Sequence, residues 1–520
     1  MKFYFVNPRT SVSFTGNDYA APVALRKYSI PPLGLLTAAG MVPREHEIRF
    51  CDENADSIDW KNDSEYVCLT GMHLQKRRIR EIATRFREMG KKIIVGGPSV
   101  MAVSEEYRDI ADILIVGEAE YVWPECLADL ARGEAKDVYR ASKTILLEDS
   151  LPPRFDLVAP RDYFSMSMQT TRGCPFTCEF CDIITLYGRK VRAKPIKNVL
   201  KEIELLVELG TDSINIVDDN FIGNQHYCAE LLEAFIDFRA RQKRPFYFTC
   251  QLTINVTQKP RLLRLLRLAG CRSVFVGIET PRKSSLEETQ KFQNSRSDLV
   301  KDVARIQSEG IAVYSGLMVG FDHDDTTIFQ EQVDFMNEAK IPTAAPHQIG
   351  ALPGTPLHKR MIAEGRLLPD TEFHMVSFQT NIRPKLMTLK ELNDGYVWML
   401  KEMFRPEPYA DRVLGQLERI SKARDRASNY NPVFIFAAFL WVLLWYIFDP
   451  NRKKLLTAYF RVTAKVMAHY RNVSDTALVH LIHYRHIAKF IDVLEDELCE
   501  EPPVNPVLEG SLETASQSKL

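Results

Sequence analysis

The chain has 520 residues, of which 45% are hydrophobic and 26% charged, a composition typical of globular proteins with a substantial core. This length predicts about three domains. The 67 lysines and arginines nearly balance the 68 aspartates and glutamates, so the net charge of −1 does not favour a nucleic-acid partner. Ten cysteines are too few for a disulfide scaffold. Because the first residues, MKFYFVNPRT, lack the long apolar stretch of a secretory signal, we expect a cytoplasmic protein.

Residues 1–145 alternate short apolar runs with amphipathic helical patterns, which predicts a doubly wound parallel sheet, an α/β fold. The expected strands are Lys2–Val6, Glu47–Cys51, Glu65–Thr70, Lys92–Val95 and Asp112–Val116. Ligands of such sheets bind at the carboxyl ends of the strands. The small or polar residues expected at those ends are Thr70, Gly71, His73, Gly96, Gly97, Gly117 and Glu118. They either admit a large flat or phosphate-bearing ligand or serve as ordinary turn residues.

A proline-rich linker, residues 146–160, leads to a second series of strands and helices in residues 161–370. The expected strands are Phe164–Gln169, Ser213–Val217, Phe246–Leu252, Ser273–Ile278, Ala312–Val319 and about Ala344–Ala351. Six βα units in succession predict a partial TIM-type barrel. The active site of such a barrel lies at the carboxyl ends of its strands.

Residues 371–500 are predicted to be helical, and the polar tail 501–520 is predicted to be disordered. Segment 433–448 is continuously apolar, but sixteen helical residues reach only about 24 Å, less than the hydrocarbon core of a bilayer. It is therefore either a helix that dips into or docks on a membrane, or a buried core helix. His480, His483 and His486 lie near one helical face, where packing or surface roles are favoured over a metal site.

The strongest signal for chemistry is the spacing C-x3-C-x2-C formed by Cys174, Cys178 and Cys181, directly after the first expected barrel strand. Thiolates bind zinc or iron–sulfur clusters. A structural zinc ion takes four closed ligands, and no fourth cysteine or histidine lies close in sequence. A cluster held by three thiolates would keep one iron free for a substrate or cofactor, so the count favours a catalytic cluster over zinc.

These cysteines, with the aromatic Phe180 before the last of them, resemble the signature of the radical S-adenosylmethionine (SAM) family. The resemblance implies a [4Fe–4S] cluster held by the three cysteines, whose open iron chelates SAM and whose electron cleaves it to a 5′-deoxyadenosyl radical. It also implies SAM contacts at the carboxyl ends of the second, fourth and fifth barrel strands. The matching residues are Asp218, Asp219, Asn220, Gly277, Glu279, Gly316 and Gly320. Arg189 and Arg192, after the cysteine loop, either contact SAM or a cobalamin phosphate or form a solvated basic turn.

A flavodoxin-like domain directly ahead of such a barrel resembles the cobalamin-binding radical SAM class, and the resemblance covers about residues 1–370. It implies that the N-terminal domain binds cobalamin through the loop residues named above. The chain lacks the D-x-H-x-x-G motif whose histidine ligates cobalt in many cobalamin proteins, and His73 does not fit that spacing. If cobalamin binds, we expect the cobalt to be held without a protein histidine.

The resemblance implies a C-methyltransferase in which methylcobalamin supplies a methyl group to an unactivated carbon of a large hydrophobic polycyclic substrate. A bacteriochlorophyllide-type tetrapyrrole is slightly favoured over a hopanoid lipid. The alternatives are a radical SAM cyclase or oxidoreductase and, from a different class, a non-catalytic iron–sulfur or zinc scaffold. Expected partners are a one-electron donor such as flavodoxin or ferredoxin and, at the periphery, the cytoplasmic face of a membrane. No side chain is required as a base at the reacting carbon, so none is nominated as catalytic.

Overall fold

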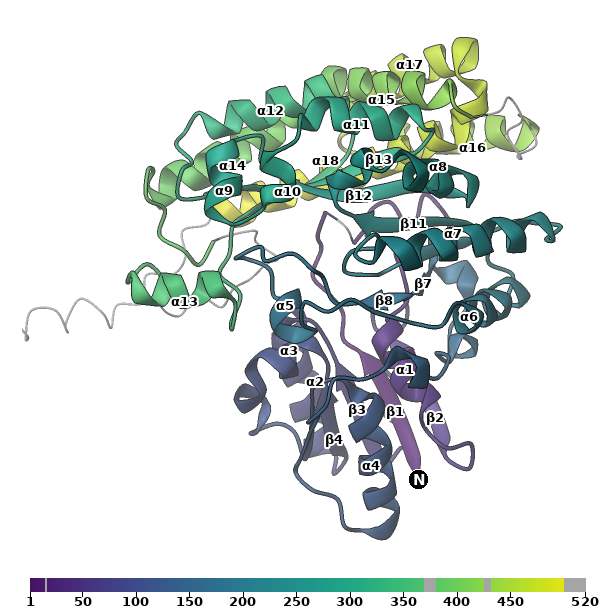
Figure 1. Cartoon of the computed structure of the whole chain (residues 1–520), viewed down its shortest axis with the longest axis vertical. Coiled ribbons are helices and arrows are strands. Elements are labelled where there is room, and N and C mark those ends of the chain that lie inside the picture. Colours follow the sequence, from purple (N-terminus) through teal and green to yellow (C-terminus); the bar gives the residue numbers. More distant parts are fainter. Residues whose placement is uncertain (15, 369–379, 425–431, 500–520) are drawn as a thin grey trace, which may run out of the picture.

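The computed structural model describes residues 1–14, 16–368, 380–424 and 432–499. Figure 1 shows three parts along the long axis of the molecule. An N-terminal α/β part lies at one end, a second α/β part lies in the middle, and a group of C-terminal helices covers the other end. The predicted α/β fold class with a helical C-terminal region is confirmed. The predicted boundaries (1–145, 146–160, 161–370 and 371–500) stay predictions, and the tail 501–520 lies outside the described residues.

The N-terminal sheet is parallel throughout, with strand order β2-β1-β3-β4-β5-β6. Its strands are β1 (Lys2–Asn7), β2 (Glu47–Asp52), β3 (Tyr66–Thr70), β4 (Lys92–Gly96), β5 (Ile113–Val116) and β6 (Val138–Arg140). The helices are α1 (Leu33–Gly40), α2 (Lys76–Glu88), α3 (Pro98–Val103) and α4 (Ala119–Arg132). Separate hydrophobic clusters cover the two faces, with Tyr4 and Val6 in one and Phe3 and Phe5 in the other. Burial on both faces explains why the strands have continuously apolar sequences.

The second sheet is also parallel, with strand order β14-β13-β12-β11-β10-β7. Its strands are β7 (Met166–Met168), β10 (Ser213–Ile216), β11 (Tyr247–Leu252), β12 (Cys271–Glu279), β13 (Ala312–Val319) and β14 (Ala344–Gln348). Because β7 and β14 end the sheet and do not pair with each other among the described residues, the barrel is open, as predicted. The helices that follow the strands are α6 (Ile196–Glu208), α7 (Gln225–Ala240), α8 (Pro260–Leu268), α9 (Lys283–Glu288), α10 (Phe292–Ser295), α11 (Leu299–Ser308), α12 (Ile328–Ala339) and α13 (Pro356–Ala363).

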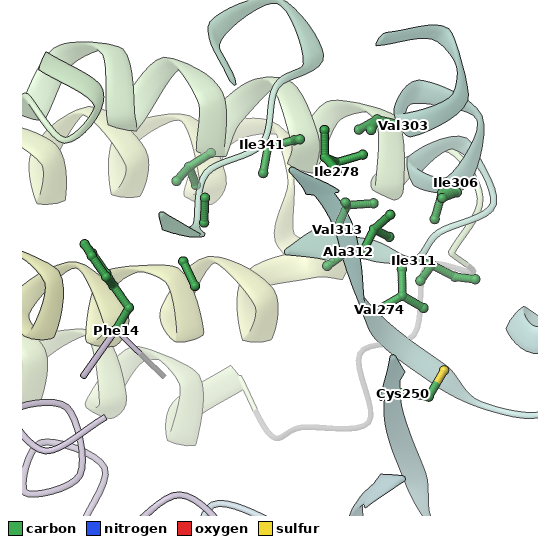
Figure 2. Packing of buried hydrophobic residues seen from close by; sticks show 14 of the residues in the cluster. Phe14, Cys250, Val274, Ile278, Val303, Ile306, Ile311, Ala312, Val313 and Ile341 are labelled. Carbon is green, nitrogen blue, oxygen red and sulfur yellow. The ribbon is translucent and has the colours of Figure 1, made fainter. Parts of the chain in front are cut away.

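The C-terminal helices pack on the barrel and share one continuous hydrophobic core with it. They are α14 (Leu389–Met403), α15 (Pro406–Ser421), α16 (Pro432–Ile447), α17 (Arg452–His469) and α18 (Ser474–Cys499). Figure 2 shows this core, in which Phe14, from the segment between β1 and α1, reaches the helices. Its ring lies 4.5 Å from that of Phe490 on α18. The N-terminal segment therefore ties the two ends of the chain together.

The apolar segment 433–448 forms α16 and the residue that follows it, and the helix is buried on one side only. None of the described helices is long and apolar enough to cross a membrane. The histidines of α18 are packing residues: His480 is fully buried against Gln416, and Nε2 of His486 lies 2.8 Å from the carbonyl oxygen of Ser13.

Candidate active site

The cysteine loop lies between two short antiparallel strands, β8 (Thr171–Arg172) and β9 (Arg192–Ala193), and precedes the short helix α5 (Ile183–Leu186). Gly173 has a φ of +97°, and a Cβ there would lie 2.7 Å from the carbonyl oxygen of Lys190. Glycine therefore lets the loop pass close to the returning chain. The N–H of Gly173 donates to Oδ2 of Asp219 at 2.7 Å, which ties the loop to the end of β10.

The three cysteines lie close enough to affect one another electrostatically. Burial raises the pKa of each thiol, that of Cys181 to about 12, and Cys178 adds to the shift of both Cys174 and Cys181. Among the described residues, no group of three or more cysteine, histidine or carboxylate side chains is arranged to hold one metal ion. A cubane cluster would bind each cysteine through a different iron, so three cysteines in one loop suit the expected cluster.

Asp218, predicted to contact SAM, holds the barrel entrance together. Its carboxylate accepts hydrogen bonds from both the backbone and the hydroxyl of Thr170, at 2.6 and 2.5 Å. It also accepts from the backbone and the hydroxyl of Thr171, at 2.9 and 2.7 Å. These four bonds join the end of β10 to the segment that leads into the cysteine loop, so they assign Asp218 a positioning role.

The two residues after Asp218 offer groups to a ligand. Burial raises the pKa of Asp219 to about 6. Asn220 is 2% exposed, and its Oδ1 accepts no hydrogen bond within the described residues. The Asn220 side chain lowers the pKa of Cys174 through a hydrogen bond, which places it beside that thiol. A buried acceptor without a donor is costly, so this site fits a ligand with N–H groups, as the amino group of SAM has.

The end of β12 carries a buried ion pair between Glu279 and Lys291. Glu279 has a φ of +68°, and a Cβ at Gly277 would lie 2.5 Å from its Oε1, so only glycine at 277 leaves room for this carboxylate. Nζ of Lys291 also lies 5.7 Å from the centre of the Phe180 ring in the cysteine loop. Glu279, Lys291 and Phe180 therefore connect β12 to the loop.

The two predicted glycines of β13 face different surroundings. A Cβ at Gly316 would meet the Phe275 ring at 3.1 Å and Oε2 of Glu279 at 3.8 Å, which places Gly316 at the predicted site. Gly320 has a φ of +96°, and a Cβ there would meet Leu392 of α14. Gly320 therefore lies at the contact between the barrel and the C-terminal helices, and its predicted contact with SAM stays a prediction.

Sequence reasoning missed a charged network that fixes the cysteine loop from the other side. Glu179, between two of the cysteines, accepts two hydrogen bonds from Arg360 of α13, at 2.7 and 2.9 Å. Arg360 also donates to Asp322, as does Arg366, at 2.7 and 2.6 Å. Burial alone would raise the pKa of Asp322, but Arg366, Lys385 and Arg360 hold it well below its usual range. The only sequence signal was a glutamate inside the cysteine motif.

A large cavity lies between the carboxyl edge of the N-terminal sheet and the barrel. Its volume is about 420 Å³, and it is partly open to solvent. Six of the seven predicted loop residues of the N-terminal domain line it: Thr70, Gly71, Gly96, Gly97, Gly117 and Glu118. Gly34 also lines it, and a Cβ there would meet nothing within 4 Å. From the barrel side, Gln169, Arg172 and Val217 line the cavity, so it reaches the ends of β7 and β10.

His73, the seventh predicted residue, does not line this cavity, and no histidine is among the described residues that do. His73 begins a short 3₁₀ helix (His73–Gln75) that follows the loop. The loop residue directly before it, Met72, does line the cavity. The size of the cavity and its glycine-rich edge fit a flat macrocycle such as a corrin. That cobalt would be held without a protein histidine, as the missing D-x-H-x-x-G motif suggests, stays a prediction.

Glu118 is held by two arginines that come from the barrel. Arg172 and Arg192 each donate to its carboxylate, at 2.7 and 2.8 Å, and Arg172 also donates to Glu120 at 2.9 Å. Glu118, Arg172 and Arg192 are almost completely buried. We call these four residues the interdomain clasp. Arg192 thus pairs with the N-terminal domain and is not part of a solvated turn, while its contact with SAM or a cobalamin phosphate stays a prediction.

Comparisons with known proteins agree with this geometry. Residues 168–331 match the model of the radical SAM superfamily, and residues 355–499 match a domain of unknown function, DUF4070. An uncharacterized methyltransferase of Synechocystis is 31% identical over 96% of this chain and 94% of its own. The hopanoid C-2 methylase of Rhodopseudomonas palustris is 34% identical over 70% of this chain and 71% of its own. The chain belongs to the radical SAM methyltransferase family.

Further matches include a methyltransferase that acts on a tetrapyrrole and a solved structure with a similar fold. The bacteriochlorophyllide d C-12(1)-methyltransferase of Chlorobaculum tepidum is 25% identical over 80% of this chain and 90% of its own. Among solved structures, the cobalamin-dependent SAM radical enzyme OxsB, with aqua-cobalamin and SAM bound, covers all of this chain and 82% of its own. Its TM-score is 0.60 at 14% identity, which shows a shared fold. The match to the radical SAM superfamily agrees with the expected [4Fe–4S] cluster and SAM, and the expected cobalamin is a proposal.

Proposed function

We propose that this methyltransferase transfers a methyl group to an unactivated carbon of a large hydrophobic polycyclic substrate, with cobalamin bound in the cavity between the N-terminal sheet and the barrel. The observation that carries this proposal is the shared cavity. The N-terminal loops that would hold cobalamin and the residues that lead into the cysteine loop line the same space. When bound, cobalamin supplies the methyl group, and SAM on the cluster supplies the chemistry that removes hydrogen from the carbon.

The residues of this chain supply position and protection from water. Cys174, Cys178 and Cys181 would hold the cluster, and Asn220 would present its buried carbonyl oxygen to SAM. Asp218 keeps the cysteine loop at the end of β10. The interdomain clasp fixes the distance between the cobalamin domain and the cluster loop. No side chain has to act as an acid or base at the reacting carbon.

For the substrate, we favour a hopanoid-type polycyclic lipid over the tetrapyrrole that the sequence slightly favoured. The identity to the hopanoid C-2 methylase, 34%, exceeds the 25% to the bacteriochlorophyllide d methyltransferase. The uncharged outer face of α16 also suits an enzyme that works near a lipid phase. The tetrapyrrole is the second candidate, because that relative matches more of this chain, 80% against 70%.

Anaerobic reconstitution with iron, sulfide and hydroxocobalamin tests the cofactors. We expect nearly one cobalt for each cluster, and iron without cobalt would contradict the proposal. The reconstituted enzyme, reduced and supplied with SAM, is then incubated with a hopanoid hydrocarbon and separately with a bacteriochlorophyllide. A product in which one hydrogen is replaced by a methyl group, a net gain of CH2, supports methyl transfer and identifies the substrate class. A cyclised or oxidised product would instead support the cyclase or oxidoreductase alternative.

Two further expectations stay predictions that belong to this function. The first is a one-electron donor such as flavodoxin or ferredoxin, which would reduce the cluster. Purified donors can be compared directly as the reductant in the methylation assay. The second is a location at the cytoplasmic face of a membrane.

A further inference from the structure

The outer face of α16 is apolar and exposed over the whole length of the helix. Ile435, Phe439, Val442 and Tyr446 form its buried stripe, all at most 8% exposed. The opposite side bears Val433, Phe434, Phe436, Leu440, Trp441, Leu444 and Ile447, all at least 40% exposed, and Phe448 follows the helix at 84%. We call these eight residues the outer apolar face. The helix contains no charged residue, so it lacks the polar face that a helix in contact with water normally has.

Positive charges border the outer apolar face. A pocket beside it is lined by Trp441, Leu444, Trp445 and Phe448 from the α16 segment and by Arg485 and Lys489 from α18. The guanidinium of Arg485 lies 4.7 Å from the centre of the Trp445 ring. Both cations pair with the buried Asp449, which neutralises only one of the two charges.

More basic residues follow directly where α17 begins. Arg452, Lys453 and Lys454 are exposed, and of these only Lys454 forms a salt bridge within the described residues, 3.8 Å from Asp492. An apolar, tryptophan-bearing face bordered by lysine and arginine is complementary to an anionic lipid surface, where apolar side chains enter the acyl region and cations meet phosphates.

We propose that the outer apolar face is a membrane-docking surface that lies in the interface of an anionic phospholipid bilayer, with Lys489 and the start of α17 at the level of the headgroups and the buried Arg485 behind them. The buried stripe holds α16 against α17 and α18, so the helix lies on the membrane and does not cross it. Sixteen residues would in any case reach only about 24 Å. Docking depends on this surface alone and does not require the substrate proposed above.

The test is sedimentation of the full-length protein with vesicles of phosphatidylcholine, with and without phosphatidylglycerol. We expect binding that increases with phosphatidylglycerol and weakens at high salt. The double variant Leu444→Ser/Phe448→Ser removes two exposed side chains, and we expect it to weaken binding by about tenfold or more. The matched control Leu205→Ser/Leu209→Ser removes two exposed leucines, one in α6 and one directly after it, and we expect binding to be unchanged. Lys453→Glu should weaken binding mainly at low salt, compared with Lys197→Glu on α6.

The possible outcomes distinguish a membrane from a second copy of the chain as the partner of this face. No sedimentation of the wild-type protein with either vesicle, or equal loss in the α16 variant and the α6 control, would overturn the proposal. A dimer that forms without vesicles and dissociates in the α16 variant would also overturn it, in favour of a second copy of the chain. Assaying the α16 variant for methylation of a detergent-dispersed substrate distinguishes a failure of the docking proposal from a failure of the proposed function. Retained turnover with lost vesicle binding supports docking, whereas absent turnover in the wild-type protein would count against the proposed function only.

Discussion

At the scale of single residues, the site depends on charges that are buried and paired. The side chains of Glu279 and Lys291 are 10% and 7% exposed, and they face each other beneath the cysteine loop. Burial alone would lower the pKa of Lys291, but Glu279 and the nearby thiol of Cys178 raise it, so the lysine stays charged. A buried cation that keeps its charge requires its carboxylate partner.

Replacing Glu279 by glutamine should therefore destabilise the protein by about 3–5 kcal/mol, because Lys291 would remain buried without a counter-charge. The double variant Glu279→Gln/Lys291→Met should recover most of this loss, since it removes both charges. The measurement is the free energy of unfolding in urea, with circular dichroism as the probe. A double variant as unstable as the single one would show that the pair is not the source of the stability.

Replacing Cys178 by alanine should remove the cluster without unfolding the chain. We expect the iron content after reconstitution and the reductive cleavage of SAM to fall to background, while the unfolding free energy changes by about 1 kcal/mol or less. Cys228→Ala is the matched control, because this thiol is fully buried on α7, away from the loop. Equal iron contents in the two variants would contradict the assignment of the cluster.

At the scale of elements, the interdomain clasp joins the start of α4 to β8 and β9, which bracket the cysteine loop. In Glu118→Gln, the buried guanidinium of Arg192 would lose its carboxylate partner, and that of Arg172 would keep only Glu120. We expect cobalamin affinity to fall by about tenfold or more, since a loss of 1.4 kcal/mol already has that effect. Iron content should not change. The control Glu125→Gln lies on the same helix in an exposed pair with Lys136, and it should keep full cobalt content. A parallel loss of iron and cobalt would instead indicate general misfolding.

The sequence predicted those elements whose signal is local. Continuous apolar runs marked five of the six N-terminal strands, and the spacing of three cysteines marked the cluster loop. The strand β6 was missed because it has only three residues. The pairing of Glu118 with Arg172 and Arg192 joins residues 54 and 74 positions apart, which no local pattern encodes. The two faces of α16 were also hidden, since a helix without polar residues does not indicate which side is buried.

At the scale of the whole molecule, α18 connects parts that are distant in the sequence. The ring of His480 lies 5.7 Å from that of Tyr314 on β13, and His486 contacts the carbonyl oxygen of Ser13. Arg485 donates to the carbonyl oxygen of Tyr19. The barrel, the N-terminal segment and the C-terminal helices therefore meet along one helix, and the state of its buried histidines affects all three.

This arrangement predicts a loss of stability in mild acid. Burial lowers the pKa of His480 to about 3 and those of His483 and His486 to about 4. The unfolded chain binds protons near pH 6.5, whereas the folded chain does not, so stability is present above that pH and decreases as the pH falls. Between pH 7.5 and 5.5 each histidine should cost about 1 kcal/mol.

The variant His480→Gln can keep the contact with Gln416 but cannot be protonated, so we expect it to lose about 1 kcal/mol less than the wild-type protein over this pH range. Urea unfolding at pH 7.5, 6.5 and 5.5 measures the difference. The control is His226→Gln, whose side chain is 82% exposed and should leave the pH dependence unchanged. Because α18 contacts the barrel and the N-terminal segment, spectroscopic probes placed in each of the three parts should report the same change in unfolding free energy with pH. A shift confined to the C-terminal helices would show that the buried histidines act only locally.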